Sequence, residues 1–250
     1  MTSTYRIQET ALLIRRYGMD NFKKPLVSIL PYYVPLSLAA LVVGHISPLM
    51  ALPFTLVSIY FSLVFAAHIH RAYITNQSTE AFNPLQPSKD DLGFIKIYVL
   101  LMLIPLGLGF LAGLIGGLIA GKTGAAILTL LSLPFIVFVI TRFSLALPDR
   151  AVGGQMGFKD SYRISNGLVW KIILAPLAAG WKIILVTFAW SIAAGVITGL
   201  VMKEGESLGA QILFFVLHAP VSFGLYFIVT AMAVAGLSNY YLWARQNQGR

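Results

Sequence analysis

Residues Ile97–Ala120 read IYVLLMLIPLGLGFLAGLIGGLIA, a run of 24 residues that contains no charged side chain. About 20 mainly apolar residues are enough for a helix to cross the hydrocarbon core of a bilayer. The stretch therefore predicts a transmembrane α-helix, and the rest of the chain has to be organised around it.

The composition of the whole chain agrees with a lipid environment. Of its 250 residues 58% are hydrophobic and 11% are charged, and the mean hydropathy is +0.80. Soluble domains carry about 25% charged residues, so this chain lacks the polar side chains to cover a wetted surface. It has no cysteine, which excludes disulfides, thiolate metal sites and cysteine nucleophiles.

Six stretches meet the length criterion for a membrane span. They are Leu26–Ile46, Leu49–Ile69, Ile97–Ala120, Ala125–Leu147, Ile183–Met202 and Leu208–Leu237. Three of the connections are short, at Ser47-Pro48, Gly121–Gly124 and Lys203–Ser207, and two are longer, at His70–Lys96 and Pro148–Lys182. Short links join antiparallel helices. The predicted fold is an all-α polytopic membrane protein, with six transmembrane helices arranged as three hairpins over residues 25–245.

The basic residues predict the orientation. Of the 18 Lys and Arg residues, 16 lie on the face that carries the termini, and the other two, Lys122 and Lys203, lie on the opposite face. Such a bias marks the cytoplasmic side, so both termini are predicted to be cytoplasmic. The charged N-terminal segment does not read as a cleavable signal, and the first span is expected to be retained.

Two segments outside the spans are predicted to be helical or to start a helix. Residues 1–24 form an amphipathic segment with an apolar stripe that includes Ile14. This segment either lies in the headgroup plane or packs on the cytoplasmic face of the bundle. Ser88 and Asp91, three residues apart, form a pattern that can start the helix of the third span. Residues 246–250 are expected to form a short cytoplasmic tail.

The sequence WKIIL occurs twice, at Trp170–Leu174 and Trp181–Leu185. A spacing of eleven residues is close to three helical turns, so both Trp-Lys pairs would face the same way. Because Pro176 and Gly180 interrupt this region, we expect an interfacial or kinked piece before the fifth span. The alternative is one long tilted helix that places Lys182 inside the bilayer.

Glycines recur at every fourth position of the third span. These are Gly109, Gly113, Gly117 and Gly121, and the fifth span has a shorter version at Gly195 and Gly199. Such a row lets another helix approach closely. It predicts a helix-packing surface, either inside the bundle or between copies of the chain.

The sequence predicts neither a metal or haem site nor an enzyme. The four histidines are not placed at one depth with further ligands, and the motif HExxH is absent. All nine acidic residues lie outside the predicted spans, which weakens an ion-coupled transporter because such proteins use ionisable groups within the membrane. We therefore expect no cofactor and no catalytic site.

Basic side chains surround the inner ends of the later spans. They are Arg142, Arg150, Lys159, Arg163, Lys171 and Lys182, and we name this set the basic collar. Cations next to apolar spans favour anionic lipid headgroups over nucleic acid as their counter-charge. The same bias is also what orientation alone requires.

One part of this region resembles a known family. Arg142–Pro148 reads RFSLALP, and Gly157–Gly167 reads GFKDSYRISNG and is followed by Trp170. These roughly thirty residues resemble the loop between the fourth and fifth spans of bacterial six-span membrane proteins of the YciC-like type. They are also similar to the membrane domain of some glycerophosphodiester phosphodiesterases. The resemblance implies a bacterial inner membrane and a short cytoplasmic helix that carries a Ser-aromatic pair, here Ser161 and Tyr162. From the residues themselves we expect these two side chains to dock the short helix back on the bundle. It brings no catalytic domain.

Two functions remain open from the sequence. The first is a non-enzymatic scaffold or accessory subunit that acts through helix packing and inner-leaflet lipid, as a homo-oligomer or with a membrane-protein partner. The second is a permease or lipid-handling facilitator whose prolines kink the spans around a cavity. His218 and Arg142 would then be polar contacts in that cavity.

Overall fold

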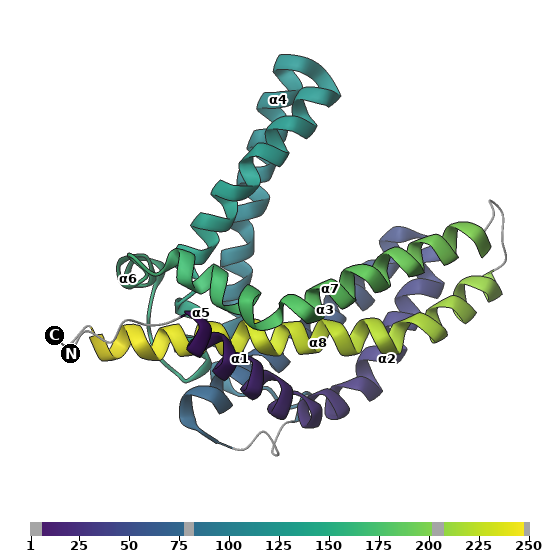
Figure 1. The fold of residues 1–250 in the computed structure, drawn as a ribbon. Helices are drawn as coiled ribbons and strands as arrows, with labels where there is room; N and C mark the ends of the chain where they lie inside the picture. Colours follow the sequence, from purple (N-terminus) through teal and green to yellow (C-terminus); the bar gives the residue numbers. More distant parts are fainter. Residues whose placement is uncertain (1–6, 78–82, 202–207, 248–250) are drawn as a thin grey trace.

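The computed structural model describes residues 7–77, 83–201 and 208–247, and these residues contain helices and no strand (Figure 1). The helices are α1 (Ile7–Asn21), α2 (Lys23–Ile46), α3 (Pro48–Thr75), α4 (Lys89–Phe143), α5 (Ala146–Ala151), α6 (Phe158–Ile164), α7 (Val169–Val201) and α8 (Leu208–Asn247). The prediction of an all-α fold is confirmed. The predicted link Lys203–Ser207 and the tip of the C-terminal tail lie outside the described residues.

Five of these helices, α2, α3, α4, α7 and α8, are long and apolar enough to cross a membrane. Many of their outward side chains are large and apolar, such as Leu49, which is 82% exposed, and Leu118, which is 81% exposed. Water would make such a surface unfavourable, at about 25 cal/mol for each Å² of exposed apolar area. The chain is therefore a multi-pass membrane protein.

Helix α4 has a reversal in its middle. Ala120 and Gly121 have non-helical backbone angles, and Gly121 has φ 62°, a left-handed value that glycine adopts without strain. Figure 1 shows the two halves of α4 running side by side and projecting away from the other helices. A Cβ atom added to Gly116 would overlap the backbone of Gly124, so these two glycines allow the halves to touch. We name residues 103–138 the α4 arm.

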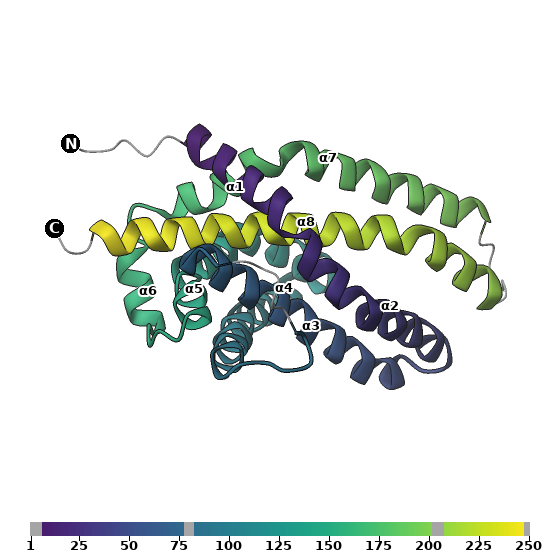
Figure 2. The same cartoon turned by 90° about the horizontal axis from the view of Figure 1, so that it is seen from below.

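Helix α7 runs without a break from Val169 to Val201. The structure thus combines the two expectations, because the piece before the fifth span is continuous with it, as in the alternative, and the helix is also kinked (Figure 1), as in the first expectation. At 1.5 Å per residue its 33 residues span about 50 Å. Figures 1 and 2 both show a change of direction after its first turns, where Pro176 lies inside the helix and removes a backbone hydrogen bond.

The N-terminal helix α1 packs on α7 and α8, and Figure 2 shows it lying across α8. Ile14 is fully buried, whereas Leu12 and Leu13 remain exposed. Gly18 lies so close to Met232 of α8 that a Cβ atom would overlap that side chain. Of the two alternatives for this segment, the structure shows packing on the bundle, and the exposed leucines leave one face available to lipid.

The main core lies where α3, α4 and α8 meet, at the end of the molecule that also carries α1, α5 and α6. Phe65, Phe94 and Phe227 are buried there. The rings of Phe65 and Phe227 meet edge to face with centroids 4.8 Å apart, a favoured aromatic geometry. This core fixes the ends of the long helices on which the polar side chains described next are placed.

Candidate functional site

Buried polar side chains gather around the ends of the long helices, close to α5 and α6. They are His70, Asp91, Thr141, Arg142, Ser144, Asp149, Ser161, Ser165 and Ser238, and we name them the polar layer. Buried polar groups need partners, because an unpaired one costs the free energy of its lost hydration. The partners found here show which segments this layer joins and which groups are left for a ligand.

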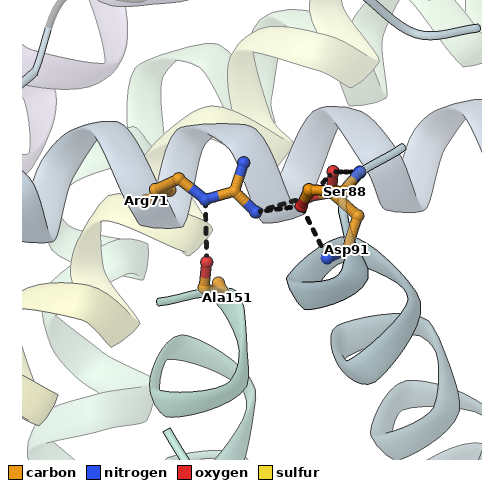
Figure 3. Close-up of polar contacts among 4 residues, drawn as sticks. All are labelled: Arg71, Ser88, Asp91 and Ala151. Carbon is orange, nitrogen blue, oxygen red and sulfur yellow. Dashed lines mark hydrogen bonds and ion pairs between the residues drawn. The ribbon is translucent and has the colours of Figure 1, made fainter. Parts of the chain in front are cut away.

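Arg71 joins three helices (Figure 3). Its Nη2 donates to Asp91 Oδ1 at 2.7 Å and to Ser88 Oγ at 3.0 Å, and its Nε donates to the carbonyl oxygen of Ala151 at 3.0 Å. Ser88 and Asp91 also form the predicted capping box, in which each side chain bonds the backbone N–H of the other. The end of α3 is thereby tied to the start of α4 and to α5. The sequence predicted the cap but not the arginine.

Asp149 is the most completely buried acid among the described residues, with no exposed surface. Its Oδ2 accepts from the backbone N–H of Met156, and its Oδ1 accepts from Tyr241 Oη and from Arg245 Nη2, each at 2.7 Å. Gly154 lies against the same carboxylate, and a Cβ atom there would overlap it. The carboxylate therefore fastens α5 and the loop after it to the end of α8.

Arg142 is the buried cation of the polar layer, with 7% of its surface exposed. Its guanidinium lies 3.9 Å from the centroid of the Tyr162 ring, and its Nη1 donates to Asn166 Oδ1 at 3.3 Å. Within the described residues no carboxylate lies within 4.0 Å of it. A buried charge without an opposite charge is unfavourable unless an anion approaches it.

The short helix α6 docks on the end of α4 through hydroxyl groups. Ser161 Oγ and Ser165 Oγ donate to the carbonyl oxygen of Arg142 at 3.1 Å and 3.0 Å. Tyr162 covers the Arg142 guanidinium and also packs on Phe143, with ring centroids 5.7 Å apart. The predicted docking of this helix through Ser161 and Tyr162 is confirmed.

The other members of the basic collar are spread over three helices. Arg150 donates to Gln155, and Lys159 is exposed on α6. Lys182 lies over the ring of its neighbour Trp181, at 5.5 Å. Arg163 and Lys171 both lie near Trp243 at the end of α8, Arg163 in the lining of the same pocket and Lys171 with its Nζ 5.8 Å from the ring centroid. The six cations therefore do not form one site.

His218 and Arg142 belong to different clusters. The His218 ring stacks on Trp190 of α7, with centroids 5.4 Å apart, and its nitrogens lie 3.0 Å and 3.1 Å from Ser222 Oγ. Trp190 Nε1 donates to the same hydroxyl at 3.2 Å. No pocket found among the described residues is lined by both His218 and Arg142. This histidine joins α7 to α8 within the apolar region.

Some glycines of the predicted row contact the returning half of α4 and others do not. A Cβ atom added to Gly113 would lie 3.5 Å from Thr129 Oγ1, and one added to Gly117 would lie 3.9 Å from Ala125 Cβ, so these two face the returning half. Gly109 and Gly195 face open space, and Gly121 forms the reversal. Gly199 lies in α7, but its surroundings are outside the described part of the chain. Gly116 and Gly124, which make the closest contact, were not singled out from the sequence.

His70 and Tyr17 are two further polar side chains at this end of the molecule. His70 Nδ1 lies 2.7 Å from Ser238 Oγ, and that hydroxyl donates its own proton to the carbonyl oxygen of Val234. The hydroxyl oxygen therefore accepts, and His70 Nδ1 carries the proton of this hydrogen bond. On α1, burial and the nearby Tyr73 raise the pKa of Tyr17 to about 12, which keeps its hydroxyl protonated. Over the residues that the structure describes, no three metal-ligating side chains lie together.

The chain matches no protein-family model, no curated protein and no solved structure. The resemblance of Arg142–Pro148 and Gly157–Gly167 to YciC-like proteins therefore stays a prediction, and function has to be argued from the geometry.

Proposed function

We propose that this protein is a scaffold or accessory subunit of a bacterial cytoplasmic membrane and not an enzyme. In this proposal it crosses the bilayer six times with both termini in the cytoplasm. It holds partner helices with its apolar surface and anionic inner-leaflet lipid with its basic end. A partner is either a second copy of the chain or another membrane protein.

The count of six rests on the two halves of α4. Residues 89–119 and 122–143 are 31 and 22 residues long, on either side of the non-helical pair, and each exceeds the ~20 residues needed for a span. Added to the other four long helices, they give six spans. The 16 to 2 distribution of basic residues supports the orientation with the termini inside.

The α4 arm carries the proposal of helix packing. Its large side chains face outward, among them Leu106, Phe110, Leu118, Ile119, Leu130, Leu131 and Phe135. Because the arm projects from the other helices (Figure 1), no part of the described chain covers these faces. Lipid covers some of this surface, and the open glycine Gly109 offers a partner helix the close approach that membrane helices use.

Gentle native purification followed by mass spectrometry of the intact assembly tests this proposal. We expect a stoichiometric partner or a homo-oligomer. Gly109→Leu should release it, because the added side chain blocks the glycine face while its Cβ atom meets no atom of its own chain within 4 Å. Gly107→Leu is the matched control, since Gly107 is equally open but points elsewhere on the helix. A lone wild-type chain, or equal loss in both variants, would contradict the proposal.

A lipid-handling facilitator is the second candidate, and Arg142 favours it. A buried guanidinium with no carboxylate partner in the described residues suits transient contact with an anionic headgroup. This function predicts lipid movement between leaflets of reconstituted liposomes. Arg142→Gln should abolish that movement, whereas the exposed Lys159→Gln should not. Wild-type liposomes that behave like empty ones would rule it out.

A further inference from the structure

A pocket lies between α6 and the end of α8. It has a volume of about 460 Å³ and is lined by Arg163, Ile164, Trp243, Ala244 and Asn247. Lys171 of α7 does not line the pocket, but its Nζ lies 5.8 Å from the centroid of the Trp243 ring. The pocket lining therefore combines one cation, one indole ring and a small apolar surface, and a second cation lies over the same indole ring.

The charge of this pocket is positive. Arg163 has one acidic neighbour, Asp160, at 3.5 Å, and their side chains are 77% and 52% exposed, so this pair holds the arginine weakly. Lys171 has no acidic partner among the residues that the structure describes. The other nearby cation, Arg245, is bound to Asp149 and does not compete for a ligand here.

Trp243 and Asn247 are two lining residues from the last turns of α8. Asn247 Nδ2 donates to the carbonyl oxygen of Trp243 at 2.7 Å, which steadies the last turn of α8. Indole rings collect at the boundary between hydrocarbon and water. The position of Trp243 therefore places the pocket at headgroup depth.

An apolar stripe starts next to Lys171 and runs along α7. Trp170, Leu174, Leu177 and Trp181 are all exposed, and their spacing of four, three and four residues puts them on one helix face. The opposite face, with Ile172, Ala175 and Ala179, is buried in the bundle. A molecule whose phosphate enters the pocket would thus have an apolar surface beside it for acyl chains.

We propose that this pocket binds the phosphate group of an anionic phospholipid, with Arg163 and Lys171 as its ligands and Trp243 against the glycerol region. The proposal rests on the proposed function in one respect, because the inner leaflet supplies the lipid only if this end is cytoplasmic. Of the six residues of the basic collar, the proposal assigns phosphate binding to two, Arg163 and Lys171.

The remaining members of the collar have other roles. Arg142 lies beneath the ring of Tyr162, and Arg150 is engaged by Gln155. Lys159 and Lys182 neither line the pocket nor lie over the Trp243 ring as Lys171 does, and Lys182 rests on Trp181 instead. Lys159 and Lys182 are both exposed, so replacing them removes the same charge without touching the pocket. They form a matched control pair.

The test compares wild type and variants of the full-length protein in nanodiscs of phosphatidylcholine with about 25% phosphatidylglycerol, an anionic lipid of the kind that attracts juxtamembrane cations. Native mass spectrometry counts the phosphatidylglycerol molecules that stay bound to the protein after it is released from the nanodiscs. A cation near an anionic surface contributes about fivefold to binding, so Arg163→Gln with Lys171→Gln should lower retention roughly twentyfold. Lys159→Gln with Lys182→Gln should lower it clearly less, because in the described structure these two cations neither line the pocket nor lie over the Trp243 ring.

Two further arms complete the design. Arg163→Lys with Lys171→Arg should keep most of the retained lipid, because charge is preserved. Excess inorganic phosphate should not displace phosphatidylglycerol if the acyl chains contribute, whereas full displacement would mean that a free phosphate is the ligand and would overturn the lipid assignment. Equal loss in the Arg163/Lys171 and Lys159/Lys182 pairs would also overturn it, since the net charge of the protein alone would then explain how much lipid is retained.

These outcomes are separate from those of the proposed function. A protein that keeps its partner but binds phosphatidylglycerol equally well in both variant pairs refutes the pocket alone. A protein whose pocket binds lipid but whose termini prove to be exported refutes the cytoplasmic orientation alone.

Discussion

Replacing Asp149 by Asn tests the polar layer most severely. The change keeps the size of the side chain and removes its charge. At present the two carboxylate oxygens accept three hydrogen bonds of 2.7 Å, from Met156 N, Tyr241 Oη and Arg245 Nη2. An amide can accept on only one side. If its oxygen faces Tyr241, its NH₂ group meets the N–H of Met156, and two donors are left facing one another.

The expected cost follows from these contacts. A hydrogen bond to a charged group contributes about 1.5–3 kcal/mol, and a buried donor left unpaired adds about 1–3 kcal/mol. Arg245 contributes little to this sum, because its side chain is 55% exposed and exposed ion pairs add at most about 1 kcal/mol. We expect a loss of about 3 kcal/mol in the free energy of unfolding, in line with the ~3–5 kcal/mol for breaking a buried pair.

For a chain of this size, 1 kcal/mol corresponds to about 2–4 °C in Tm, so Asp149→Asn should lower Tm by roughly 6–12 °C. Intrinsic tryptophan fluorescence during heating in detergent measures this change, and Trp243 of α8 lies near the affected contacts. Asp160→Asn is the control, because it removes the same charge from a side chain that is 52% exposed. Its Tm should stay within about 2 °C of wild type. Equal Tm values for the two variants would refute the assigned role of the buried carboxylate.

Two more substitutions test how the long helices are held. Arg71→Gln should lower the free energy of unfolding by about 2–3 kcal/mol, since it releases Asp91 and the carbonyl of Ala151. In the same thermal assay, replacing the exposed Lys89 by Gln should have no measurable effect on Tm. Equal Tm shifts in the two variants would contradict the account. Gly116→Ala should open the α4 arm, because its Cβ would overlap the backbone of Gly124, whereas Gly109→Ala meets nothing within 4 Å. Limited proteolysis in detergent should cut the arm of Gly116→Ala faster than that of Gly109→Ala, and identical rates would show that the glycine contact does not hold the arm.

Features with local causes could be predicted from the sequence. The capping box of Ser88 and Asp91 depends on residues three positions apart, and it forms as expected. The apolar runs that become α2, α3, α4, α7 and α8 also carry their signal within one window of about 20 residues. Ser161 and Tyr162 dock α6 as expected, because a short amphipathic helix between two spans has few other surfaces to cover.

Features that depend on long-range contacts could not be predicted. Asp149 and Tyr241 are 92 positions apart, and nothing near either residue in the sequence indicates the other. The same holds for Arg71 and Ala151, which are 80 positions apart. The glycine pattern pointed to regular spacing, while the contact between Gly116 and Gly124 arises from the reversal at Gly121. The signal in the sequence that could have predicted this contact is that Gly116 and Gly124 lie on either side of a predicted turn.

The spacing of basic residues was informative about location and not about pairing. It placed six cations at one end of the spans, yet Arg142 became buried under Tyr162, while Arg163 and Lys171 met at Trp243. Which cation faces a ligand is decided by how α6 and the end of α8 pack, and that packing is tertiary.

The central claim is that both halves of α4 cross the membrane and that the chain ends on the side opposite the tip of the arm. The chain has no cysteine, so single cysteines can be introduced without removing others. Thr123→Cys, near the reversal of α4, and Gln246→Cys, at the end of α8, are both at exposed positions. A membrane-impermeant maleimide applied to intact bacterial spheroplasts should label Thr123→Cys and should label Gln246→Cys only after permeabilisation. Labelling of Gln246→Cys in intact spheroplasts, or protection of Thr123→Cys, would contradict the account.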